Sequence, residues 1–92
     1  MEEKPVSLRR ELEFRLGAVS KDLKSITGVE RFSIERQTDL GATSLVEAFY
    51  EKRGYTKVVV DGNARVFKRE TGSVVYVKTT IESRDYVFEI VE

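Results

Sequence analysis

Three short clusters of turn-forming residues divide the stretch from Tyr55 to Val91 into four segments rich in β-branched and aromatic side chains. The clusters are Asp61-Gly62-Asn63, Thr71-Gly72 and Glu82-Ser83-Arg84-Asp85. Strands joined by such short turns pair antiparallel, and the length of each turn decides which residues lie opposite one another. The pattern therefore predicts a meander of four strands, and it constrains the fold more than any other feature of the chain.

The register of this meander follows from the requirement that directly opposed side chains agree in polarity. A three-residue Asp61-Gly62-Asn63 loop places Val58 opposite Val66, and a two-residue Thr71-Gly72 loop places Val66 opposite Val77. The last hairpin places Val77 opposite Ile90 whether its loop has two or four residues. We expect the resulting apolar face to pack on helices; it holds Val58, Val60, Ala64, Val66, Val75, Val77, Ile81, Tyr86, Phe88 and Ile90.

The opposite face of the predicted sheet mixes aromatic, aliphatic and charged side chains, and it is too apolar to be left to solvent. A strip formed by Arg65, Lys78 and Glu89 crosses its middle, and this strip carries a residual positive charge. We therefore expect this face to contact a partner. The candidate contact residues are Tyr55, Lys57, Arg65, Phe67, Arg69, Tyr76, Lys78 and Glu89.

The first half of the chain has helical periodicity. Apolar residues at steps of three and four predict a helix from about Ser7 to Gly28, either bent or divided at Gly17. This stripe consists of Leu8, Leu12, Leu16, Val19, Leu23 and Ile26. A short strand at Phe32 to Ile34 follows, and then a second helix from Ser44, which has capping-box spacing to Glu47, up to Gly54.

Together these elements predict an α+β fold in the order α-β-α-β-β-β-β, with a mixed or antiparallel five-stranded sheet and the helices packed on one face. A chain of 92 residues has room for one hydrophobic core, so we expect a single domain spanning residues 1–92. The strand, helix and strand in succession favour a crossover connection that runs the first strand parallel to a member of the meander.

Composition excludes several classes of function. Lysine plus arginine and aspartate plus glutamate both number 16, so no global field attracts nucleic acid or an anionic membrane. The chain has no cysteine and no histidine, and we expect no metal, no cofactor and no catalytic activity. Apolar runs such as Val58 to Val60 are far too short to span a membrane, and Met1 to Pro5 has no signal-peptide character, which predicts a cytoplasmic protein. The abundance of charged residues resembles that of thermophile proteins.

Two functional hypotheses use the same predicted face. The preferred one is a non-catalytic binding or assembly domain that forms a homodimer. The alternative is a small nucleic-acid-binding protein, because aromatic residues within a basic surface are the arrangement that stacks unpaired bases.

A second contact is predicted on the first helix. Phe14 lies away from the leucine stripe and beside Gly17 and Ala18, where small residues would permit close approach in a homodimer seam. The other interpretation of Phe14 is a single exposed aromatic, or one covered by the N-terminal residues.

Two short segments resemble known families. Asp39 to Leu45 is similar to the loop-to-helix segment of acyl carrier proteins, in which Ser44 would carry phosphopantetheine, although Thr43 stands in place of the usual acidic residue. Glu47, Asp61 and Tyr76-Val77-Lys78 resemble the core of PD-(D/E)xK nucleases, in which acids hold Mg²⁺ and the lysine assists hydrolysis. Because Tyr76 replaces the last acid, this resemblance implies a catalytically degenerate relative.

Overall fold

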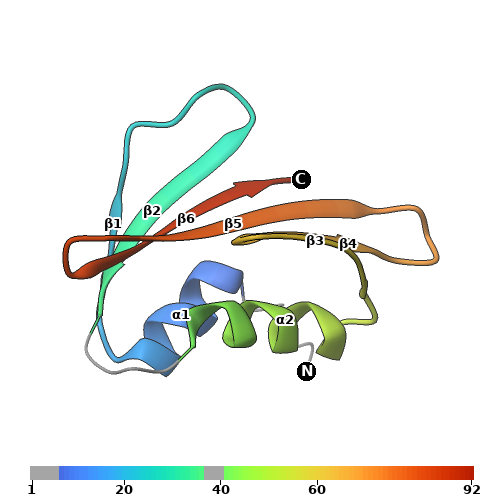
Figure 1. Cartoon of the computed structure of the whole chain (residues 1–92), viewed down its shortest axis with the longest axis horizontal. Coiled ribbons are helices and arrows are strands. Elements are labelled where there is room, and N and C mark those ends of the chain that lie inside the picture. The colour runs from blue at the N-terminus through green and yellow to red at the C-terminus, as the bar shows by residue number, and fades with distance from the viewer. Residues whose placement is uncertain (1–6, 37–40) are drawn as a thin grey trace, which may run out of the picture.

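The computed structural model describes residues 7–36 and 41–92, in which two helices lie beneath a six-stranded sheet (Figure 1). In chain order the elements are α1 (Leu8–Leu16), β1 (Ser20–Asp22), β2 (Val29–Glu35), α2 (Ala42–Lys52), β3 (Thr56–Asp61), β4 (Ala64–Lys68), β5 (Val74–Glu82) and β6 (Asp85–Val91). The α+β class predicted from the sequence is confirmed.

The sheet has the strand order β1-β2-β6-β5-β4-β3, and every neighbouring pair is antiparallel. The prediction of five strands is wrong, because β1 adds an edge strand beside β2. The strand predicted at Phe32 to Ile34 is longer than expected, and it pairs with β6, with Phe32 opposite Phe88. It runs in the same direction as β3 and β5, but it is hydrogen-bonded only to antiparallel neighbours.

Helix α1 begins at Ser7, whose hydroxyl accepts a hydrogen bond from the Arg10 amide at 3.2 Å. The leucines at positions 8, 12 and 16 are buried, as their spacing predicts. The helix ends at Gly17, which adopts a left-handed φ of 71°, so the predicted continuation to Gly28 is wrong. The remaining apolar residues of the predicted stripe lie outside any helix, and Val19 and Ile26 are exposed.

The strand β1 forms where a helix was expected because its polar side chains are bound by α1. The carboxylate of Glu13 accepts hydrogen bonds from the Ser20 amide at 2.8 Å and from the Ser20 hydroxyl at 2.9 Å. These bonds hold the pKa of Glu13 below its usual value. The guanidinium of Arg9 donates to Ser20 and to Asp22. These contacts between helix and strand anchor the edge of the sheet.

Helix α2 begins earlier than its capping-box spacing predicts. Its N-cap is Gly41, which makes no side-chain capping bond, so Ser44 lies exposed in the first turn instead of capping it. The helix ends at Arg53, before Gly54 at φ 87°. Its inward face consists of Ala42, Val46, Phe49 and Tyr50, whereas Leu45 is half-buried and Ala48 is exposed.

The predicted register is confirmed for β5 and β6, where Val77 lies opposite Ile90 and Lys78 opposite Glu89. The other two hairpins are shifted by one residue. The β3–β4 loop contains only Gly62 and Asn63, and the β4–β5 loop contains three residues, 70–72, closed by the Arg69 amide donating to the Ser73 carbonyl at 3.0 Å. Glycine supplies the left-handed φ in each loop, 58° at position 62 and 94° at position 72.

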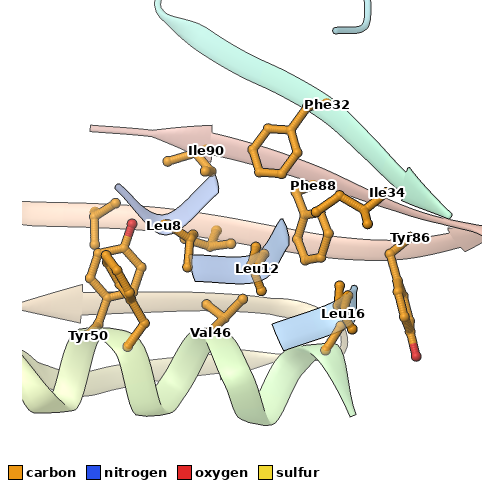
Figure 2. Packing of buried hydrophobic residues seen from close by; sticks show 14 of the residues in the cluster. Leu8, Leu12, Leu16, Phe32, Ile34, Val46, Tyr50, Tyr86, Phe88 and Ile90 are labelled. Carbon is orange, nitrogen blue, oxygen red and sulfur yellow. The ribbon is translucent and has the colours of Figure 1, made fainter. Parts of the chain in front are cut away.

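The hydrophobic core lies between the helices and one face of the sheet. The rings of Phe32 and Phe88 stack with centroids 5.2 Å apart, and Figure 2 shows both on the helix side of their strands. The Tyr50 ring of α2 stacks on Phe67 of β4 at 4.9 Å. Because both helices cover the same face, no helix of residues 7–36 and 41–92 lies on the other face of the sheet (Figure 1).

Candidate interaction surface

We use the term outer face for the side of the sheet that is turned away from α1 and α2. Because side chains alternate along a strand, the registers of the strands give its members directly. One apolar row crosses five neighbouring strands of this face, and we call it the valine–tyrosine row. It consists of Val29, Val91, Tyr76, Val66 and Val59, in the order β2-β6-β5-β4-β3.

The valine–tyrosine row is partly open to solvent, with two exposed residues and three half-buried ones. Val59 is 49% exposed and Val91 36% exposed, and Val74, which neighbours Tyr76 along β5, is 48% exposed. No element of residues 7–36 and 41–92 lies over this row (Figure 1). An uncovered apolar row of this width is typical of a contact surface.

A second row on the outer face, two residues further along each strand, is charged. This charged row consists of Asp61, Ala64, Lys78, Glu89 and Arg31, in the order β3-β4-β5-β6-β2. Glu89 forms an ion pair with Arg31 at 3.4 Å, and it also lies opposite Lys78. Two positive and two negative side chains cancel, so the row has alternating charge and no net field.

The eight predicted contact residues do not share one face. Tyr76, Lys78 and Glu89 lie on the outer face, as expected. The one-residue shift of β4 turns Arg65 and Phe67 to the helix side, where Phe67 is 0% exposed. A further three of the predicted residues lie on the helix side or at its edge; they are Tyr55, Lys57 and Arg69.

The predicted basic patch is neutralised by α2. The Glu47 carboxylate accepts hydrogen bonds from Lys57 Nζ and from Arg65 Nε, both at 2.9 Å. Arg65 Nη1 also donates to the Ala64 carbonyl at 2.9 Å. The hydrogen bond from Lys57, and then that from Arg65, keeps the pKa of Glu47 below its usual value. Glu47 therefore binds two strands of the sheet to α2.

This three-residue cluster gives a testable pH dependence. Because the folded state lowers the pKa of Glu47, its stabilisation is present above the unfolded-state pKa and is lost as the pH falls through the folded-state value. We expect Glu47→Gln to reduce the free energy of unfolding by about 1 to 2 kcal/mol at pH 7, with wild type and variant converging in acid. Urea unfolding at pH 7 and at pH 3 measures this.

Glu51→Gln is the matched control, because Glu51 is exposed on the same helix and should change stability by less than about 0.5 kcal/mol. A stability difference between Glu47→Gln and wild type that is as large at pH 3 as at pH 7 would contradict the assignment.

The residues that resemble the nuclease core are not brought together. Asp61 and Lys78 belong to the charged row of the outer face, whereas Glu47 lies on the helix side and is bound to Lys57 and Arg65. Across the part of the chain that the structure describes, no group of three acidic side chains is placed to hold a metal ion. The geometry therefore provides no Mg²⁺ site from these residues.

The segment that resembles acyl carrier proteins is only partly described. Asp39 and Leu40 lie outside the described residues, and Ser44 is an exposed residue of α2. Six antiparallel strands accompany this helix, in contrast to an all-helical carrier.

The residues of the predicted homodimer seam are separated by the end of α1. Phe14 is 79% exposed on the helix, whereas Gly17 is its C-cap and Ala18 packs against the core. Gly17 and Ala18 therefore do not form a small-residue stripe on a helix. Phe14 is an isolated exposed aromatic within the described residues of α1.

The valine–tyrosine row was only half predicted from the sequence. Tyr76 belongs to the predicted contact set, whereas Val66 is predicted in the core because of the shifted register, and Val29 precedes the predicted first strand. Val29 shares its face of β2 with Arg31 and Ser33, so the sequence carries no apolar pattern that would have identified it.

Comparison of the chain with protein-family models, with curated proteins and with solved structures found no match. Neither helix of residues 7–36 and 41–92 is long and apolar enough to cross a membrane.

Proposed function

We propose that this protein is a non-catalytic assembly domain that forms a homodimer through the outer face of its sheet. The observation that carries the proposal is the valine–tyrosine row, which crosses five strands and is left uncovered on the side without helices. In a homodimer, the valine–tyrosine row of one copy would cover the valine–tyrosine row of the other. The product would be two sheets packed face to face, with helices on both outer sides.

The charged row favours a second copy as the partner. In a face-to-face pair, a two-fold axis can run along the strands between β5 and β6. Lys78 of each copy then faces Glu89 of the other, and Tyr76 faces Val91 in the neighbouring row. The same axis therefore pairs opposite charges in the charged row and apolar side chains in the valine–tyrosine row. This self-complementarity is what a symmetric interface requires.

The area available is consistent with a modest interface. Five strands spaced about 4.8 Å apart, over about four rows of side chains, give on the order of 500 to 600 Å² for each copy. Specific interfaces usually bury about 800 Å² on each partner, so this one lies near the lower limit. We therefore expect a dimer whose population depends on concentration, with a dissociation constant on the order of 1 to 100 μM.

Nucleic-acid binding by the same face has less support. The predicted set of aromatic and basic residues is divided, since Phe67 is buried and Lys57 and Arg65 are bound to Glu47. The charged row of the outer face has no net positive charge to neutralise phosphates. These contacts favour protein over nucleic acid as the partner.

The decisive experiment is sedimentation equilibrium of wild type and Tyr76→Asp across a concentration series. Tyr76 lies next to the proposed two-fold axis. Because the substitution is present in both copies, it places two carboxylates in the interface. We expect Tyr76→Asp to raise the dissociation constant at least 30-fold, as for a central interface aromatic. A wild-type chain that stays monomeric at millimolar concentration would defeat the proposal.

The orientation of the two copies is tested by exchanging charges. Lys78→Glu and Glu89→Lys should each weaken dimerisation by about 10-fold, and the double exchange should restore it. Melting temperatures of the dilute monomers separate loss of association from loss of folding. If the double variant associates no better than the single variants, the proposed axis is wrong. Salt-dependent binding of an oligonucleotide by a monomeric wild type would instead support the nucleic-acid alternative.

A further inference from the structure

A cleft of about 570 Å³ opens on the helix side of the molecule, away from the outer face. It lies where the start of α1, the end of α2, the turn after β4 and the ends of β2 and β6 meet. Its size falls within the range of small-molecule sites in proteins. Its apolar wall includes Leu8, Phe49 and Ile90, which all belong to the hydrophobic core.

Two guanidinium groups line this cleft, and each is held against an aromatic ring. The Cζ atom of Arg53 lies 3.5 Å from the centre of the Phe49 ring, and its Nη1 donates to the Phe49 carbonyl at 3.0 Å. The Cζ atom of Arg69 lies 4.5 Å from the centre of the Tyr55 ring. Stacking restricts both side chains, so they would lose little conformational freedom on binding an anion.

Arg69 has a hydrogen-bond donor without an acceptor. Its Nε atom is buried and makes no hydrogen bond, and Arg69 forms no ion pair within residues 7–36 and 41–92. By contrast, Arg65 and Arg9 both reach carboxylates. A buried donor without a partner is unfavourable, and the Arg69 guanidinium keeps a hydrogen-bonding capacity that no carboxylate of the described residues uses.

Carboxylates lie on another part of the cleft wall. Glu30 and Glu92 line it together with the two arginines, so the charges of the lining sum to zero. Burial, and to a smaller extent the charges of Glu92 and Glu30, raise the pKa of the Tyr50 hydroxyl, which stays protonated as a donor at neutral pH. A dianionic phosphate would be repelled by two carboxylates. A ligand with one negative and one positive group matches the wall better.

We propose that this cleft binds a small zwitterion of the amino-acid class, with its carboxylate on Arg69, its ammonium group toward Glu30 and Glu92, and an apolar side chain on the Leu8 and Ile90 wall. The apolar wall, the arginines and the carboxylates all line this one cleft. The site is independent of the outer face, so it does not depend on dimer formation.

The test is a ¹H–¹⁵N NMR titration with L-phenylalanine as the probe. We expect the amide signals of Tyr55 and Arg69 to shift, with a dissociation constant on the order of 0.1 to 1 mM for a ligand of this size. The analogues 3-phenylpropionate, which lacks the ammonium group, and phenethylamine, which lacks the carboxylate, should each bind at least 10-fold more weakly. No shift at 10 mM L-phenylalanine, a concentration about 10-fold above the weaker limit, would overturn the proposal.

Variants assign the two ends of the ligand. Arg69→Met retains the aliphatic stem and should weaken L-phenylalanine binding at least 10-fold, whereas Arg10→Met, on the exposed surface of α1, should leave it unchanged. The double variant Glu30→Gln/Glu92→Gln should weaken L-phenylalanine but not 3-phenylpropionate. Equal binding of these two compounds by wild type would overturn the zwitterion assignment.

Discussion

Phe67→Ala is expected to lower the free energy of unfolding by about 3 to 4 kcal/mol, because it empties a fully enclosed site in the core. Phe67 is 0% exposed and stacks on Tyr50 at 4.9 Å. The cavity would lie between α2 and β4, where the surrounding rings cannot close it without moving the helix. For a domain of this size the loss is a large part of the total stability of about 5 to 10 kcal/mol. Urea unfolding followed by circular dichroism measures it.

Tyr76→Ala is the matched control for this prediction. Tyr76 is an aromatic residue on the adjacent strand, but it lies on the outer face and is only half-buried. We expect it to cost less than about 1 kcal/mol when measured at a protein concentration low enough for a monomer. If Phe67→Ala instead cost as little as Tyr76→Ala, Phe67 would lie on the outer face, which is where the register predicted from the sequence places it.

The difference between the two registers arises from turn length. Matching apolar residues across the strands favours a three-residue and then a two-residue loop, which places Val66 in the core and Phe67 outside. Each of the two loops is off by one residue, so the faces of β4 are exchanged. A bulge between Lys57 and Val59 in β3 adds a further shift that no turn signal indicates.

The matching rule failed at a residue whose partner is distant in the sequence. Arg65 lies on the helix side because Glu47, eighteen positions earlier on α2, accepts its Nε hydrogen at 2.9 Å. Considered along the strand alone, a charged residue on the covered face is a penalty, so polarity matching does not favour the observed register. The charge of Arg65 is neutralised by Glu47 only once α2 packs on the sheet.

The last hairpin was predictable because both of its candidate loops gave the same pairing. Val77 opposite Ile90 and Thr79 opposite Phe88 are observed as expected. The three outer-face residues of the predicted contact set, Tyr76, Lys78 and Glu89, all come from this hairpin. The part of the candidate surface that could be predicted is thus the part whose register did not depend on turn length.

The failure at residues 19–26 has a different origin. Helical spacing of Val19, Leu23 and Ile26 predicts either a continuation of α1 or a second short helix, although a glycine at position 17 can also end the helical segment. In the structure the chain turns back at Gly17 and pairs Ser20 with Ile34. Periodicity alone cannot distinguish a helix from a strand here. Ser20 is held in the strand by donating two hydrogen bonds to the Glu13 carboxylate, and the spacing of apolar residues carries no information about these bonds.

Leu12→Ala should have the second large effect, about 3 kcal/mol of lost stability. Leu12 is the central leucine of α1 and is 0% exposed between Leu8 and Leu16. Its removal leaves a cavity beneath the sheet, and it also weakens the attachment of β1, since β1 is bound to α1 through Glu13 and Arg9. Hydrogen exchange of β1 and β2 amides should therefore accelerate more than that of β5 amides.

Phe14→Ala is the control on the same helix, and it also decides between two dimers. Phe14 is exposed, so its replacement should change stability by less than about 0.5 kcal/mol. Because Phe14 belongs to the helix layer and Tyr76 to the opposite side of the sheet, one substitution cannot affect both proposed interfaces directly. Sedimentation of Phe14→Ala should match wild type if the outer face is the interface. Dissociation of this variant, with Tyr76→Asp still dimeric, would move the interface to α1 and refute assembly through the sheet.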